Sequence, residues 1–149
     1  MKISDPVSSL LEHKSNALWQ VTPESMVYDA IREMADRDIG ALLVMNKGRL
    51  VGIVSERDYT REVILMGKSS KKTPVRDIMT RDPVCVRPED TIADCMQLMT
   101  DKRLRHLPVV HDDQVVGIVS IGDAVKWIIS AQDSLINQLE HYIKGSYPV

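Results

Sequence analysis

The sequence predicts an α/β protein of the mixed α+β kind, in which two tandem β-α-β-β-α units pack sheet to sheet about a pseudo-two-fold axis. Residues 51–58 read Val-Gly-Ile-Val-Ser-Glu-Arg-Asp, and residues 116–123 read Val-Gly-Ile-Val-Ser-Ile-Gly-Asp. At an offset of 65 residues, residues 21–61 align without a gap on residues 86–126 and share 14 of 41 positions. Such repetition indicates a duplicated unit. Because three strands and two helices leave one wide apolar face, we expect the copies to pack against each other.

Each copy shows the same order of elements. A short extended segment, residues 18–21 or 84–86, leads to Pro23 or Pro88, which we expect in the first turn of a helix because a proline there loses no hydrogen bond. Apolar residues then recur at helical spacing as far as Met34 or Met99. Two strands joined by a short turn follow, at residues 41–45 and 50–54 or 107–110 and 115–119. A second helix is expected from Glu56 or Ile121.

The predicted domains are residues 7–67 and 75–134, with a linker at 68–74 and a helical extension and tail at 135–149. Pro6-Val7 and Leu10-Leu11 precede the first copy as Pro74-Val75 and Ile78-Met79 precede the second, at an offset of 68 residues, so the first copy carries three extra residues. The segment Gly67–Thr73 is polar and basic, which predicts an exposed connection. The last helix, expected near residues 123–144, bears an apolar stripe typical of a surface for a partner helix: Trp127, Ile128, Ala131, Leu135, Ile136, Leu139 and Ile143.

The composition is that of an ordinary soluble globular protein, with 44% hydrophobic and 27% charged residues among 149. A net charge of −2 gives no electrostatic case for binding nucleic acid or an anionic membrane. Cys85 and Cys95 lack a metal-ligand spacing and are expected as reduced thiols of a cytoplasmic protein. No apolar run reaches the roughly 18 residues of a membrane span, and the start, Met1 to Leu11, does not resemble a signal peptide.

The two Ser-x-x-Asp motifs, Ser55 with Asp58 and Ser120 with Asp123, match capping boxes at the start of a helix. Each cap is worth about 1 kcal/mol, and capping by itself explains the pattern. The same positions also suit a nucleotide, because a carboxylate at a strand end can accept the hydroxyls of a ribose and an open helix N-terminus favours phosphate.

The chain resembles the CBS domain pair, named for cystathionine β-synthase. The resemblance rests on the duplicated unit ending in Gly-Ile-Val-Ser-x-x-Asp, on residues 105–110 and on residues 75–80. It implies a regulatory, signal-transducing module without enzymatic activity, which binds an adenosine compound in the clefts between the copies and often forms disc-shaped homodimers. We expect a stand-alone pair, whose output would pass through an unknown regulated protein or through its own oligomerisation.

The resemblance also assigns roles to single residues. Asp123 and Asp58 would hold ribose, and Arg105 and His106 would engage phosphate, although a surface charge pair on a loop is the alternative for these two. The first copy has Gly40 and Ala41 at the corresponding positions, so the two clefts would be unequal.

Arg57, whose counterpart is Gly122, would reach the phosphate of the ligand held by the opposite copy, which makes the Asp123 cleft the preferred site. Arg61, one helical turn further on, would join it, with a solvated helix face as an equal alternative. The backbone of the extended segments would receive the adenine, with a plain core strand as the alternative: Thr80, Val84, Cys85 and Val86.

No catalytic or metal-binding constellation is found, because the four histidines lack acid or nucleophile partners at a recognisable spacing: His13, His106, His111 and His141. The main hypothesis is a regulatory binder of adenine nucleotides, with AMP as first choice because one phosphate matches the few basic groups. NAD and ATP come next, and ADP and S-adenosylmethionine remain alternatives. The second hypothesis is an interaction or dimerisation module without ligand, acting through the C-terminal helix.

Overall fold

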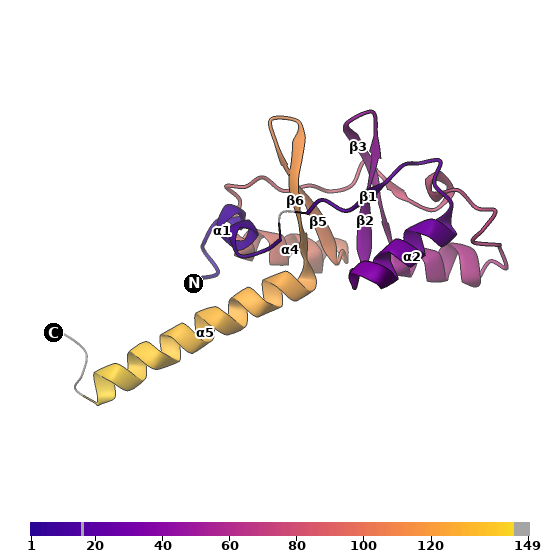
Figure 1. Cartoon of the computed structure of the whole chain (residues 1–149). Helices are drawn as coiled ribbons and strands as arrows, with labels where there is room; N and C mark the ends of the chain where they lie inside the picture. Colours follow the sequence, from indigo (N-terminus) through magenta and orange to yellow (C-terminus); the bar gives the residue numbers. More distant parts are fainter. Residues whose placement is uncertain (16, 145–149) are drawn as a thin grey trace. The chain divides into compact units, whose positions relative to one another are not determined.

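A computed structural model describes residues 1–15 and 17–144 and has two units, each built around one copy of the repeat. The copy-1 unit contains residues 17–85 and 110–116. The copy-2 unit contains the described residues of 1–15, 86–109 and 117–144. The mixed α and β composition that the sequence predicts is confirmed (Figure 1).

The copy-1 unit holds a four-stranded sheet in the order β1-β2-β3-β4. Strands β1 and β2 are parallel, and the other neighbours are antiparallel. Its strands are β1 (Gln20–Val21), β2 (Ala41–Asn46), β3 (Arg49–Ser55) and β4 (Thr80–Arg81). Its helical segments are α2 (Val27–Arg37), α3 (Glu56–Tyr59), the π-helical turn Thr60–Ile64 and the 3₁₀ turn Val75–Asp77. Strand β2 is buried at its first four positions, which explains its continuous apolar run.

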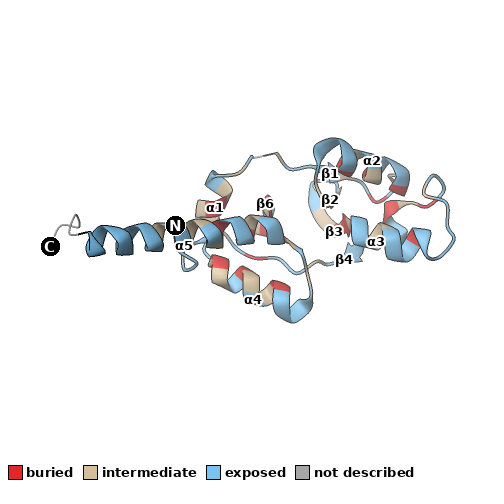
Figure 2. Cartoon of the chain, turned by 90° about the horizontal axis from the view of Figure 1, so that it is seen from below, coloured by how far each residue is buried: buried red, intermediate tan, exposed pale blue. Residues whose placement is uncertain are grey.

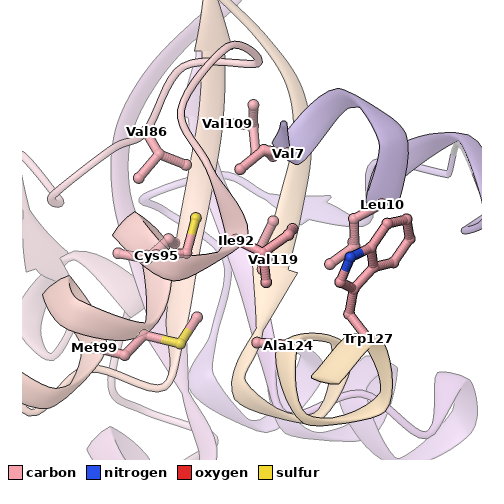
Figure 3. Packing of buried hydrophobic residues seen from close by; sticks show 11 residues of the cluster. Val7, Leu10, Val86, Ile92, Cys95, Met99, Val109, Val119, Ala124 and Trp127 are labelled. Carbon is pink, nitrogen blue, oxygen red and sulfur yellow. The ribbon is translucent and has the colours of Figure 1, made fainter. Parts of the chain in front are cut away.

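The second copy repeats this plan with two paired strands, with α4 equal in length to α2 and with α5 much longer than α3. The elements of the copy-2 unit are α1 (Val7–Glu12), α4 (Ile92–Lys102), α5 (Ile121–Ile143) and the parts of β5 (His106–His111) and β6 (Gln114–Ser120) that lie outside residues 110–116. The bridge of Val86 with Val109 repeats the pairing of Val21 with Val44, 65 residues earlier in the sequence. Figure 3 shows the core of this unit, where side chains of α1, α4, β6 and α5 meet, among them Leu10, Ile92, Val119 and Trp127.

The prediction that Pro23 and Pro88 lie in the first turn of a helix is wrong. Helices α2 and α4 begin four residues later, at Val27 and Ile92. Each proline instead occupies the second position of a turn, which is closed by Ser25 N–H donating to Thr22 O at 3.2 Å and by Asp90 N–H donating to Arg87 O at 3.0 Å. The fixed φ of proline favours that position as well, so the residue type alone does not distinguish the two placements.

The predicted ends of helices and strands are otherwise close to those observed. Helices α2 and α4 end at Arg37 and Lys102, and each is followed by a left-handed residue. The hairpins turn through two residues with positive φ, Lys47–Gly48 and Asp112–Asp113, as two-residue turns that match the strand twist require. Helices α3 and α5 begin at Glu56 and Ile121 as predicted.

The segment that precedes each copy belongs to the unit of the other copy. Pro6, before the first copy, bridges to Thr91, and Pro74, before the second copy, bridges to Met26. The glycines of the repeated octapeptide permit this packing. A Cβ on Gly117 would lie 2.7 Å from the Leu11 side chain, and one on Gly52 would lie 2.8 Å from the sulfur of Met79 and from the backbone oxygen of Thr80.

The expected exposed linker Gly67–Thr73 is mostly exposed, but its last residue is not. Thr73 is buried, its hydroxyl donates to Ser69 O at 2.7 Å, and its carbonyl accepts from Val27 N–H at 2.9 Å. Ser70 O likewise accepts from Tyr28 N–H at 3.0 Å. The end of this connection therefore satisfies backbone donors in the first turn of α2.

The single apolar stripe expected on the last helix is in fact two faces. Trp127 is 5% exposed and packs in the copy-2 core, whereas Ile136 is 51% and Ile143 is 81% exposed. Figure 2 shows the second half of α5 as exposed along its length. The tail beyond residue 144 lies outside the described residues.

Candidate functional site

Both predicted capping boxes are present. At the start of α3, Ser55 N–H donates to Asp58 Oδ2 at 2.9 Å and Asp58 N–H donates to Ser55 Oγ at 3.3 Å. At the start of α5, Ser120 N–H donates to Asp123 Oδ2 at 2.9 Å and Asp123 N–H donates to Ser120 Oγ at 3.1 Å. The carboxylates therefore lie where a buried strand ends and a helix begins, as the sequence indicated.

The two aspartates differ in charge environment. Lys14 Nζ lies 2.5 Å from Asp123 Oδ2 and also donates to Ile118 O at 2.7 Å. Burial raises the pKa of Asp123, but the bonds from Lys14 and Ser120 outweigh it, so the pKa lies below the usual value. At Asp58, burial outweighs the bonds from Ser55, and the pKa is raised. The charged form of Asp123 is thus stabilised more than that of Asp58, and the contact with Lys14 distinguishes the two sites.

Sequence reasoning missed Lys14. It lies in the copy-2 unit, 109 positions before Asp123, just beyond α1. The corresponding position before the second copy is Asp82, so the repeat offers no signal for a lysine there. Only the packing of α1 into the copy-2 unit brings its side chain to Asp123.

Arg105 and His106 belong to the same neighbourhood. Arg105 is exposed at the entry to β5, and its carbonyl accepts from Ile121 N–H at 2.8 Å, which ties it to the first residue of α5. Burial, Arg105 and Lys14 lower the pKa of His106 to about 4, against the opposing charge of Asp123. The structure therefore brings together two cations, one neutral imidazole and one carboxylate beside the N-terminus of α5.

Arg57 and Arg61 lie on the copy-1 unit. Both are exposed, and with Glu56 and Thr60 they line an open depression along α3 and the π-helical turn. Arg57 and Asp123 belong to different units. The expectation that Arg57 contacts a ligand held by Asp123 therefore stays a prediction.

The segment expected to receive adenine is extended, and its side chains differ in exposure. Thr80 is exposed and pairs with Ile53, and Val84 is 37% exposed. Val86 is buried in the copy-2 core, and its N–H donates to Pro108 O at 2.9 Å. Its N–H is therefore engaged within the fold, and the core-strand interpretation describes its side chain. Cys85 is exposed.

Comparison with known proteins decides the family. The CBS domain pattern matches residues 15–65 and 75–130, which is both copies of the repeat. The chain belongs to the CBS domain family. This CBS pair is similar to the CBS domain-containing protein CBSX3, mitochondrial, of Arabidopsis thaliana. The two are 40% identical over 154 residues, and the alignment covers 97% of this chain and 74% of that protein.

Solved CBS proteins share the fold. A protein from Burkholderia ambifaria MC40-6, described as a candidate signal-transduction protein with CBS domains, is 44% identical with a TM-score of 0.83, over 86% of this chain and 96% of that one. The CBS domain pair of protein MJ0100, solved in complex with 5′-methylthioadenosine and S-adenosyl-L-methionine, is 21% identical with a TM-score of 0.75, over 85% of this chain and 97% of that one. At that identity the likeness shows the fold alone.

Two further features are absent from the part of the chain that the structure describes. None of their helices combines the length and the hydropathy that a membrane crossing requires. No group of three or more His, Cys, Asp or Glu side chains among them is arranged to hold a metal ion.

Proposed function

We propose that this CBS pair is a regulatory module that binds an adenosine compound, with AMP as first choice, at Asp123. The observation that carries the proposal is the placement of the Asp123 carboxylate at the N-terminus of α5, where Lys14 binds it. Arg105 is held at the first residue of the same helix by its carbonyl, which accepts from Ile121 N–H. A ribose hydroxyl donates to a carboxylate, and a phosphate is stabilised by cations and by the positive end of a helix dipole. One site of this kind satisfies both ends of a nucleoside monophosphate.

The bonds to Asp123 leave an acceptor for the ribose. Lys14 and Ser120 both bind Oδ2, so Oδ1 is the oxygen to which a ribose hydroxyl donates. His106 is neutral near pH 7, because its pKa of about 4 lies well below that pH, and it acts as a hydrogen-bonding group without adding positive charge. Arg105 and Lys14 then balance the negative charge of the phosphate.

The MJ0100 pair, which shares the fold, was solved with two adenosine derivatives, so the fold accommodates the ligand class proposed for this chain. Asp58 lacks a lysine comparable to Lys14 and has a raised pKa, so we rank it second. A module with this role acts by differential binding, in which the ligand favours one conformation or one partner-bound form. Catalysis has no part in the proposal, and the homodimer and the cytoplasmic location stay predictions from the sequence.

A thermal-shift panel tests the proposal with AMP, ADP, ATP, NAD and S-adenosylmethionine. At a ligand concentration of about 100 times Kd, the stabilisation is about 2.7 kcal/mol, which corresponds to a rise in Tm of about 5–10 °C for a chain of this size. We expect AMP to give the largest rise at equal concentration. The absence of a rise with any of the five would instead favour an interaction module without ligand.

The decisive variant is Asp123→Ala, and Asp94 provides a matched control. Asp94 closes the capping box of α4 with Thr91, so Asp94→Ala removes the same kind of cap from a helix that has no part in the proposed site. Calorimetric titration with AMP should show binding to Asp94→Ala and a loss of at least tenfold in affinity for Asp123→Ala. Equal affinity for the two variants would refute the role of Asp123.

A further inference from the structure

Helix α5 carries two apolar faces, of which its own unit covers only one. Ala124 and Trp127 are buried, and Ala131 and Ser134 are half-buried, at spacings of three and four residues. The side chains on the opposite face are between 44% and 81% exposed: Val125, Ile129, Ile136, Leu139 and Ile143. The core of the copy-2 unit therefore does not account for the second face, and α5 extends beyond that core (Figure 1).

The exposed face follows a heptad. Its positions alternate at spacings of four and three residues without interruption: Val125, Ile129, Gln132, Ile136, Leu139 and Ile143. The a positions are all isoleucine, and the d positions are valine, glutamine and leucine. This is the pattern of a helix that packs lengthwise against another helix, here over residues 125–143, or about 28 Å.

The flanking positions favour one orientation of the partner helix. The g positions are apolar, Ile128, Leu135 and Tyr142, and the e positions are charged, Lys126, Asp133 and Glu140. In a parallel pair g faces e, so Asp133 and Glu140 would lie against apolar side chains. In an antiparallel pair of identical helices g faces g and e faces e, so the apolar edges join and Lys126 meets Glu140 of the second copy. Only the contact between Asp133 and Asp133 of the second chain is then repulsive.

The same face is complementary to itself under a two-fold axis. An axis near residue 134 places each a position opposite a d position: Ile129 opposite Leu139, Ile136 opposite Gln132, and Ile143 opposite Val125. A contact with this symmetry closes at two copies. We propose that the exposed face of α5 pairs with the same face of a second copy of the chain in antiparallel orientation.

Cysteine cross-linking of the full chain distinguishes the arrangements. In a Cys85→Ser background, Ile129→Cys and Leu139→Cys are prepared separately, because Cys85 is exposed and Cys95 is buried. The antiparallel contact predicts a disulfide-linked dimer when the two variants are mixed and oxidised gently, and little from either variant alone. Self-linked dimers of each variant alone would overturn the orientation, and the absence of any linked dimer would overturn the pairing itself.

A second pair of variants tests whether the apolar face drives the contact. Ile136→Glu places a charge on the face, and Gln138→Glu places the same charge on the same helix away from it. We expect Ile136→Glu to lower the yield of the mixed dimer at least tenfold and Gln138→Glu to leave it unchanged. Circular dichroism of both variants checks that α5 stays folded. A folded Ile136→Glu variant that still cross-links fully would refute the proposal.

Discussion

Replacing Lys14 with methionine tests the electrostatic basis of the candidate site. The change keeps the length of the side chain but removes the cation that binds Asp123 Oδ2 at 2.5 Å. The side chains of Lys14 and Asp123 are 30% and 20% exposed, so the pair lies between a surface ion pair and a buried one. Surface pairs contribute about 0.2–1 kcal/mol and hydrogen bonds to charged groups about 1.5–3 kcal/mol. We therefore expect Lys14→Met to lower the free energy of unfolding by about 1–2 kcal/mol.

A double-mutant cycle with Asp123→Asn isolates the pair, because asparagine keeps an oxygen that can accept from Ser120 N–H. Urea unfolding followed by tryptophan fluorescence measures the four free energies near pH 7. The expected loss corresponds to a fall in Tm of about 2–8 °C for each single variant. Lys47→Met, in the exposed turn between β2 and β3, is the control and should change stability by less than about 0.5 kcal/mol.

The pH dependence gives a second test. Because the pKa of Asp123 in the folded chain lies below its usual value, the coupling is present above about pH 4 and is lost as the pH falls through the folded pKa. The cycle repeated at successively lower pH values below about 4 should give a coupling energy that declines as the carboxylate of Asp123 is protonated. A coupling below about 0.3 kcal/mol near pH 7, or one that does not change with pH, would show that Lys14 and Asp123 do not interact in solution.

Three further outcomes follow from particular contacts. Gly52→Ala should destabilise the chain by about 1–3 kcal/mol, and by more than Gly117→Ala. The new Cβ at Gly52 meets a backbone oxygen, whereas the one at Gly117 meets a leucine side chain that can rotate. Urea midpoints measure the difference, and the reverse order would contradict the packing. His106 should titrate near pH 4 by NMR, and a titration near 6.5 would exclude the buried environment. Because its folded pKa lies below the unfolded value of about 6.5, the free energy of unfolding should fall as the pH decreases from about 6.5 to about 4. The slope of this fall should be weaker in His106→Gln. A thiol reagent should modify Cys85 rapidly and Cys95 only after denaturation, because burial raises the pKa of Cys95 to about 11; rapid reaction of both thiols in the native chain would contradict the core assignment.

The repeat explains why so much of the fold was predictable. The starts of α3 and α5 follow from Ser55 and Ser120, whose hydroxyls cap the free N–H groups of the next turn, and these are local effects that the sequence states directly. The placement of the prolines was wrong because Pro23 and Pro88 suit a turn as well as a first helical turn. The sequence predicts a single apolar stripe on α5 because it does not show which apolar side chains the rest of the unit covers.

The duplicated unit, its family and the capping aspartates of α3 and α5 can be recognised from residue types a few positions apart. The packing of the segment before each copy into the unit of the other copy is visible only in the folded chain, and so is the contact of Lys14 with Asp123. An ion pair between residues 109 positions apart depends on how the chain folds back, and no local pattern encodes that arrangement.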